Sequence, residues 1–372
     1  MKHKKHVNLV KPMGGKWGRL EIAFLGAPCG EIKKLSGHII SSLSNNWNTA
    51  YVDADHNVTD RQEWSSLDHG ATAQLTNKIT HYELQLQPGT SHYFNSAELV
   101  IVNGNHFKAK SQIAWVHPKK SLESKLDKLT NVGLVILDDE IDVIPEYLTN
   151  HLSGSDYQVL KRADQEKIID YFINLLENNI PPLNGLVLIG GKSTRMQKDK
   201  SQLIYHEGLP QHEHMFNLLD KFCQKTFISV RDDEQAATYS TPTISDKFVG
   251  LGPYGGILSA FQDNPNTAWL VVAVDLPFVD KNTISQLVQA RNIHKTATSF
   301  LDRKDEFPEP LITIWEPKAY PVLLEFLSKG YSCPRKALIN SDVEIIADRD
   351  KNILMNVNTP QEYETIREQS GK

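Results

Sequence analysis

Cysteine is scarce in this chain, and its scarcity limits the class of protein. Among 372 residues only Cys29, Cys223 and Cys333 are cysteine, and they lie far apart. An odd number at such spacing makes a poor disulfide framework, and no pair has the short spacing of zinc ligands. The sequence therefore favours a reducing compartment, and we expect a cytoplasmic protein.

Long apolar runs and an excess of positive charge are also missing. No run approaches the ~20 apolar residues that a membrane-spanning helix needs, and the basic residues 1–10 are not followed by the apolar core of a signal peptide. The formal net charge of −5 argues against a general nucleic-acid binder, although a local basic patch could still hold phosphate. We therefore expect no membrane and no nucleic-acid partner.

The length of the chain indicates more than one domain. A chain of 372 residues is long for one core, and usual domain sizes suggest about two. Residues 164–179 show apolar residues at helical spacing, and Pro181 and Pro182 then prevent the helix from continuing. A new apolar strand starts at once, so we predict two domains, residues 1–180 and residues 183–372.

Both halves alternate short apolar runs with segments of helical spacing. Continuous apolar strands separated by helices are typical of a parallel sheet covered on both faces, so we predict an α/β fold with two three-layer domains. Ligands of such sheets bind beyond the carboxyl ends of the strands. The strand candidates lie at residues 21–28, 49–56, 97–105, 111–118 and 131–140 in the first half, and at 185–191, 225–231, 268–277 and 309–315 in the second.

A basic, glycine-containing loop follows the first strand of the second half. The segment "LVLIGGKSTRMQKDK", residues 186–200, contains Gly190 and Gly191 directly after the apolar run. Glycines let the backbone turn tightly, and successive N–H groups in such a turn form an anion-binding concavity. Arg195 and Lys200 would add positive charge for a phosphate group. A solvated surface loop is the alternative.

Asp275 ends another apolar strand, in "WLVVAVDLPFV". A carboxylate at a buried position needs a partner, and magnesium is a natural one because it takes oxygen ligands and shares them with nucleotide phosphates. The alternative is that Asp275 caps the helix that follows. Both Asp275 and the loop at 190–200 follow strand ends, so we expect them to face one crevice.

Two further segments supply weaker signals. Gly252, Gly255 and Gly256 lead into a helix, where clustered glycines could bring backbone N–H groups close to a ligand; a plain tight turn is the alternative. In "MNVNTPQEYETI", Asn356 or Asn358 could supply a polar ligand. The same segment also reads as an ordinary helix start.

These motifs together resemble a known family. The segments "GGKSTRMQKDK", "GLGPYGG", "VVAVDLPFV", "FPEPLITIW" and "NVNTPQEY" occur in this order, and they are similar to the molybdenum cofactor guanylyltransferases, the MobA family. The resemblance covers the chain from about Pro182 to the C-terminus. It implies a Rossmann-like nucleotidyltransferase domain (GT-A-like) with a mixed, mostly parallel sheet. It also implies transfer of GMP from GTP to molybdopterin, with release of pyrophosphate.

The resemblance assigns roles to residues of this sequence. Arg195 and Lys200 would stabilise charge that develops toward pyrophosphate, and Mg²⁺ would be the cofactor. GTP and molybdopterin would be the small-molecule partners, with a molybdoenzyme apoprotein as a further partner. The implied sites are catalytic Arg195, Lys200 and Asp275; nucleotide-binding Leu188, Gly190, Gly191, Ser229, Asp246 and Gly255; and metal-binding Asp275 and Asn356.

The sequence departs from the family pattern at three positions. Ile189 replaces a small alanine, Gln197 replaces a glycine, and Ser229 stands where the family has an asparagine. The first two departures could narrow the nucleotide pocket or stiffen the loop. They keep open a cytidylyltransferase, a sugar-phosphate nucleotidyltransferase, and a cofactor carrier or docking protein without catalysis. Arg335 and Lys336 are candidates for the pterin site, with an exposed basic turn as the alternative.

The first half shows an incomplete phosphate-binding motif. "FLGAPCGEIKKL" resembles the P-loop pattern G-x-x-x-x-G-K-[ST] starting at Gly26, but Glu31, Ile32 and Lys33 replace its glycine, lysine and hydroxyl. The half weakly resembles MobB, the GTP-binding partner of MobA, with the nucleotide site degenerate; an unrelated α/β domain is the alternative. In "YVDADHNV", a strand-end turn held by aspartate hydrogen bonds is favoured over a metal cluster of Asp53, Asp55 and His56.

Overall fold

The computed structural model divides the chain into two compact units. Unit 1 comprises Met1–Thr90 and Ala97–Asn178, and unit 2 comprises Ser91–Ser96 and Asn179–Lys372. Residues 91–96, which the sequence groups with the first half, thus belong to unit 2, where Nδ2 of Asn95 donates to the carbonyl oxygen of Lys318 over 2.9 Å. The described residues are 17–54, 65–76, 81–84, 94–189, 200–205, 208–302, 306–347, 353–357, 359 and 361–364.

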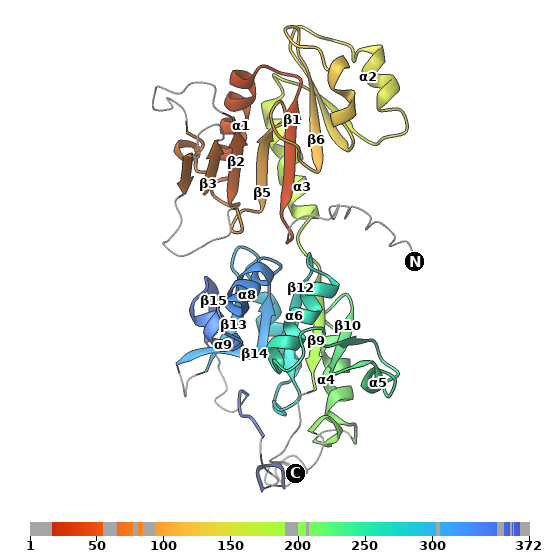
Figure 1. Ribbon diagram of the computed structural model, residues 1–372, viewed down its shortest axis with the longest axis vertical. Coiled ribbons are helices and arrows are strands. Elements are labelled where there is room, and N and C mark those ends of the chain that lie inside the picture. Colours follow the sequence, from red (N-terminus) through yellow and green to blue (C-terminus); the bar gives the residue numbers. More distant parts are fainter. Residues whose placement is uncertain are drawn as a thin grey trace, which may run out of the picture. The chain divides into compact units, whose positions relative to one another are not determined.

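The described part of unit 1 contains an eight-stranded sheet in the order β4-β3-β2-β5-β1-β6-β7-β8 (Figure 1). The strands are parallel except β4, which pairs antiparallel with β3. Their bounds are β1 Leu20–Leu25, β2 Thr49–Asp53, β3 Ala73–Thr76, β4 His81–Leu84, β5 Leu99–Asn103, β6 Ser111–Val116, β7 Val132–Leu137 and β8 Gln158–Lys161. The α-helices are α1 Cys29–Leu43, α2 Glu146–His151 and α3 Gln165–Asn178, and the 3₁₀ helices are η1 Leu67–His69 and η2 Glu123–Lys128.

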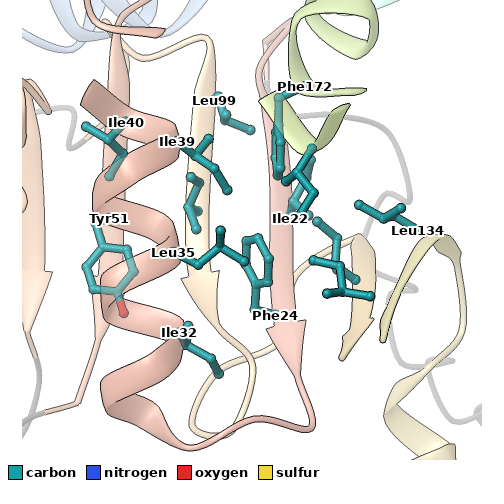
Figure 2. Close-up of a cluster of buried hydrophobic side chains, with 14 of the residues drawn as sticks. Ile22, Phe24, Ile32, Leu35, Ile39, Ile40, Tyr51, Leu99, Leu134 and Phe172 are labelled. Atoms are coloured by element: carbon teal, nitrogen blue, oxygen red, sulfur yellow. The ribbon is translucent and has the colours of Figure 1, made fainter. Parts of the chain in front are cut away.

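Helices α1 and α3 share one core with the sheet of unit 1. Helix α1 buries residues at helical spacing, including Ile32 and Ile39, and α3 buries Phe172 in the same way. These side chains form one cluster with strand residues such as Phe24 and Leu99. Figure 2 shows the side chains of α1 pointing toward these strands. Burial of this apolar stripe, rather than helix propensity, holds both helices in place.

Unit 2 contains a seven-stranded sheet within its described residues, in the order β11-β10-β9-β12-β14-β13-β15 (Figure 1). Strand β14 is antiparallel to both of its neighbours, β12 and β13, and the remaining pairs are parallel. The strands are β9 Leu183–Leu188, β10 Thr226–Val230, β11 Thr243–Ser245, β12 Ala268–Ala273, β13 Ala297–Asp302, β14 Phe307–Trp315 and β15 Val343–Ala347. The helices are η3 Lys200–Gln202, α4 Gln211–Leu219, α5 Asp233–Ala236, α6 Pro253–Asp263, α7 Lys281–Gln289, α8 Ala319–Ser328 and α9 Pro334–Ile339.

Helices cover both faces of this sheet. Val187 and Leu270 lie in a core with side chains of α4 and α7. Their chain neighbours Leu186 and Val271 lie in a second core with side chains of α6, α8 and α9. Since successive side chains of a strand point to opposite faces, both faces are apolar and both need helices. The predicted α/β class and the mixed, mostly parallel sheet of the second half are confirmed.

No helix among the described residues has the length and apolar character to cross a membrane.

Candidate active site

Four parallel strands of unit 2 bring the predicted site residues to one edge of the sheet. Leu188 of β9 lies level with Ser229 of β10 on one side and with Ala273 of β12 on the other. Asp246 directly follows β11, and its N–H donates to the carbonyl oxygen of Val230 over 2.9 Å. Asp275 follows β12 by two residues. Because these strands are parallel, their carboxyl ends form the edge where α/β sheets bind ligands.

Asp246 carries a perturbed carboxylate at this edge. The Ser229 side chain hydrogen-bonds the carboxylate, yet burial dominates and raises the pKa of Asp246 to about 6. Oδ1 of Asp246 is buried and accepts no hydrogen bond among the described residues. A buried acceptor without a donor costs free energy, so this oxygen is suited to a ligand that donates hydrogen bonds.

Gly255 and Gly256 have a packing role that the sequence did not reveal. A Cβ atom on Gly255 would lie 2.4 Å from the carbonyl oxygen of Phe248. On Gly256 it would lie 2.6 Å from Oγ of Ser229 and 2.9 Å from Cδ2 of Leu188. Gly256 therefore lets α6 approach the ends of β9 and β10 beside Ser229, whereas Gly255 lets α6 pack against the backbone of the turn that precedes it. The structure thus places Gly256, rather than the predicted Gly255, against Leu188 and Ser229 of the candidate nucleotide site.

We expect Gly255→Ala to destabilise unit 2 by about 2 kcal/mol, because the new methyl group meets backbone that cannot move aside. Gly30→Ala is the matched control, since Gly30 also lies in a helix but has no atom within 4 Å of an added Cβ. Urea unfolding followed by tryptophan fluorescence measures both changes. Equal stability of the two variants would contradict the close-packing account.

Asp275 lies next to the segment that contains Asn356. The N–H of Val357 donates to the carbonyl oxygen of Asp275 over 3.0 Å, which joins residues 82 positions apart in the sequence. Asp280 caps α7 by accepting the N–H of Thr283 at 2.8 Å, so the alternative role of Asp275 as the cap of that helix is excluded.

The donor set at this place fits magnesium. Oδ1 of Asn356 is buried and has no hydrogen-bond partner among the described residues, and one carboxylate oxygen of Asp275 is also buried. A carboxylate and an amide carbonyl are oxygen ligands of the kind that Mg²⁺ takes, and it commonly needs only one or two from the protein. The helix-start reading of the neighbouring segment also holds, because Thr359 and Glu362 exchange hydrogen bonds in a capping box.

Tyr205 is a neighbour of Asp275 that the sequence analysis missed. Its ring lies in a small buried cluster with Leu203 and Val357, and it packs edge-on against Tyr363 at 5.1 Å between centroids. Burial, followed by the charges of Tyr363 and Asp275, raises the pKa of Tyr205 above its ordinary value. No local pattern in the sequence links Tyr205 to Val357, so only the fold shows that both lie near Asp275.

The structure describes only some of the other residues that the sequence analysis singled out. Ile189 is 5% exposed and packs in the core that contains Val187 and Val274. The core therefore takes up the larger side chain of Ile189, and its effect on the nucleotide pocket stays a prediction. Lys200 begins η3. Gly190, Gly191, Arg195 and Gln197 lie outside the described residues.

Arg335 and Lys336, the candidates for the pterin site, are engaged within unit 2. Nη2 of Arg335 donates to Oε2 of Glu309 over 2.8 Å, and the Glu309 side chain is only 3% exposed. Burial is the largest influence on Glu309 and raises its pKa, against the opposing effect of Arg335. Lys336 lies over the ring of Tyr331, 5.8 Å from its centroid. Arg335 thus forms a structural ion pair, which neither the pterin-site prediction nor the alternative of an exposed basic turn included.

Arg335→Ala is expected to lower the free energy of unfolding by about 3 kcal/mol, because it leaves the buried carboxylate of Glu309 without its cation. Adding Glu309→Gln should recover most of the loss, since the buried charge is then gone. Chemical denaturation of the wild type, both single variants and the double variant gives the coupling energy. Additive losses in this cycle would show that the pair does not act as a unit.

The P-loop-like segment of unit 1 lacks room for a phosphate-binding loop. Helix α1 already begins at Cys29, three residues after Gly26. Glu31 accepts from Nη2 of Arg162 over 2.9 Å, and Ile32 is fully buried in the core. The predicted failure of the motif therefore has a structural basis: the residues that replace its ligands hold α1 on the sheet.

Asp53 has the hydrogen bonds expected of a strand-end aspartate. Its carboxylate accepts from Oη of Tyr51, the N–H of Ala54 and Nδ2 of Asn103, at 2.7 to 2.8 Å. Asp55 and His56 lie outside the described residues. No group of three or more His, Cys, Asp or Glu side chains suited to a metal ion occurs among the residues that the structure describes.

Comparison with known proteins defines the class of unit 2. Residues 185–344 match the family model of the MobA-like NTP transferase domain. This part of the chain is therefore a nucleotidyltransferase domain of the MobA type. The model includes no residue of the first half, so the resemblance of that half to MobB stays a prediction.

Particular relatives are involved in molybdenum cofactor biosynthesis. The chain is 34% identical over 187 residues to the molybdenum cofactor biosynthesis bifunctional protein of Synechocystis sp., a match that covers 50% of this chain and 54% of that protein. It is 26% identical to the molybdenum cofactor guanylyltransferase of Pseudomonas putida, over 49% of this chain and 95% of that protein. The chain thus spans about half the length of the Synechocystis protein.

Among solved structures, molybdopterin-guanine dinucleotide biosynthesis protein A from Archaeoglobus fulgidus aligns with a TM-score of 0.44 and 22% identity, over 50% of this chain and 98% of that one.

Proposed function

We propose that unit 2 transfers GMP from GTP to the terminal phosphate of molybdopterin and releases pyrophosphate. The names of the matched relatives support the substrate pair. The observation that carries the choice of GTP is the buried Oδ1 of Asp246, which has no donor among the described residues. It lies at the sheet edge where the MobA-type domain has its predicted nucleotide site.

A carboxylate at this position discriminates between bases. Guanine presents two adjacent donors, N1–H and N2–H, and an ionised Asp accepts hydrogen bonds only. Cytosine presents a single amino donor next to acceptor atoms, which a carboxylate would repel. Asp246 therefore favours GTP over CTP, and its hydrogen bond from Ser229 orients the carboxylate for this contact.

Asp275 and Asn356 would hold Mg²⁺, since their oxygens fit the ion. When bound, the ion neutralises phosphate charge and orients the reacting groups for in-line displacement. The backbone hydrogen bond from Val357 to Asp275 supports this pairing, because it holds the two segments together. Tyr205 lies close enough to Asp275 for the charge of that carboxylate to raise its pKa.

The transfer makes one bond and breaks another. A phosphate oxygen of the acceptor attacks the α-phosphorus of GTP, and the bond from this phosphorus to the oxygen that bridges it to the β-phosphorus breaks. The nucleophile is already ionised, so no general base is required, and positioning with charge stabilisation accounts for catalysis. In this proposal Arg195 and Lys200 stabilise the charge that develops on pyrophosphate.

Calorimetric titration tests the nucleotide assignment. GTP should bind in the presence of Mg²⁺ and outcompete CTP and UTP, and Lys200→Ala should weaken its binding. A preference for CTP would replace the guanylyl reaction with a cytidylyl reaction. Failure to bind any nucleotide would favour the rival in which the chain carries or docks the cofactor without catalysis.

A further inference from the structure

Cys29 of unit 1 lies in a cluster of polar side chains that nucleotidyl transfer does not use. It is the first residue of α1, a helix of 15 residues, and its thiol is partly exposed. Its Sγ lies 3.3 Å from Nε2 of His106 and 3.7 Å from Nδ2 of Asn105. A thiol beside a histidine has a base within reach of its proton.

Two lysines bring positive charge to the same cluster. Nζ of Lys125 donates to Oδ1 of Asn105 over 2.9 Å. Nζ of Lys120 lies 3.5 Å from the carbonyl oxygen of Ala27, which also accepts from Nδ2 of Asn105 at 3.0 Å. Burial, then the charges of Lys120 and Lys128, lowers the pKa of Lys125. Neighbouring ammonium groups repel each other, so an anion bound between these lysines would reduce their electrostatic repulsion.

The nearby carboxylates have cationic or polar partners of their own. Glu31 is held by Arg162, and Asp53 by Tyr51 and Asn103. The two lysines can therefore attract an incoming anion. The N-terminus of α1 acts in the same direction, because the helix dipole favours negative charge at that end.

We propose that Cys29 is a nucleophilic thiol that forms a mixed disulfide with small disulfides bearing carboxylates. The Cys29 proton passes to Nε2 of His106, and the sulfur attacks one sulfur of the reagent. A bond forms between these two sulfurs as the disulfide of the reagent breaks, and the departing thiolate takes up the proton. Cys29 is oxidised and the departing sulfur is reduced, so the disulfide is the only oxidant required. Lys120 and Lys125 hold the carboxylates of the reagent.

The other two cysteines provide internal controls. Burial raises the pKa of Cys223 to about 12, which makes its thiolate rare at neutral pH. Cys333 is exposed, so exposure alone would make it the fastest to react. The proposal instead predicts that the partly exposed Cys29 reacts faster than Cys333.

Alkylation of the full chain, mapped by mass spectrometry, tests the charge argument. Iodoacetate carries a negative charge and iodoacetamide does not. The rate of reaction with iodoacetate divided by the rate with iodoacetamide should be about fivefold higher at Cys29 than at Cys333. One nearby cation would produce a difference of this size. Lys125→Gln or Lys120→Gln should lower the Cys29 ratio, whereas Lys119→Gln, which removes an exposed charge from the same loop, should not. His106→Gln should slow both reagents at Cys29.

Incubation with oxidised glutathione completes the test. A mixed disulfide should form first at Cys29 and should form more slowly in Lys125→Gln, with circular dichroism confirming that each variant is folded. Reaction that follows exposure, with Cys333 modified first, would overturn the proposal. Equal ratios of the iodoacetate rate to the iodoacetamide rate at Cys29 and Cys333 would also overturn it. So would equal effects of Lys125→Gln and Lys119→Gln on the ratio at Cys29.

Discussion

Asp275→Asn is expected to lower the rate of nucleotidyl transfer by about 10²–10³-fold, the loss typical of removing one charge-stabilising group from an active site. The substitution keeps the size of the side chain and the backbone hydrogen bond from Val357. It removes one negative ligand for Mg²⁺, so affinity for the ion should fall as well. Steady-state release of pyrophosphate at several magnesium concentrations separates the loss of affinity from the loss of rate.

Asp263→Asn is the matched control for this variant. Asp263 is exposed in α6 and lies 3.5 Å from Lys247, so its substitution changes the same charge on the same unit. It should leave turnover unchanged. If Asp275→Asn also retained full turnover, the assignment of Asp275 to the metal would be wrong.

Asp246→Asn is expected to weaken GTP binding by about 10–100-fold, since a good bidentate contact to a base is worth about 1–3 kcal/mol. The amide nitrogen of the new side chain donates, and it would meet the donor groups of guanine. The preference for GTP over CTP should shrink by a similar factor. Parallel titrations with both nucleotides measure this change, and an unaltered preference would exclude Asp246 from base recognition.

The pH dependence gives an independent check on Asp246. Its pKa of about 6 predicts that GTP binding weakens as the pH falls through 6, because the carboxyl becomes protonated. The pKa of the folded state lies above the ordinary value of 3.8 for an aspartate, so ionisation of the carboxylate lowers the stability of the fold as the pH rises from about 4 to 6. Asp246→Asn should therefore be more stable than the wild type above pH 6 by about 1 kcal/mol, since solvent screens a partly exposed group. Urea unfolding across this pH range should show no such gain near pH 4.

Strand positions were predictable where the apolar pattern is strong. The central strands β9 and β12 are buried on both faces, and Leu186 and Val187 show why, since they face separate cores. Strands β11 and β15 are partly exposed and lack this pattern, and the sequence did not predict them. The position of Asp275 beyond β12 also follows from the sequence, because a carboxylate directly after a buried strand must lie at the sheet edge. These local signals were sufficient to predict the fold class and the position of Asp275 in the candidate site.

Long-range contacts account for what the sequence could not provide. Tyr205 belongs to the surroundings of Asp275 only because Val357 joins the C-terminal segment to β12. Arg335 was a candidate for the pterin site, with an exposed basic turn as the alternative, but its guanidinium pairs with the buried carboxylate of Glu309. Gly255 looked like a ligand-binding glycine, and its closest constraint is the carbonyl of Phe248. In each case the deciding partner lies in another element of the chain or in a turn that no local pattern identifies.

The most direct test is a turnover assay of the full chain with molybdopterin, magnesium and either GTP or CTP, in which released pyrophosphate is measured. The account predicts stoichiometric pyrophosphate and a molybdopterin–GMP product with GTP, and much slower release with CTP. Absence of pyrophosphate with every nucleotide, from a folded protein that still binds molybdopterin, would contradict it.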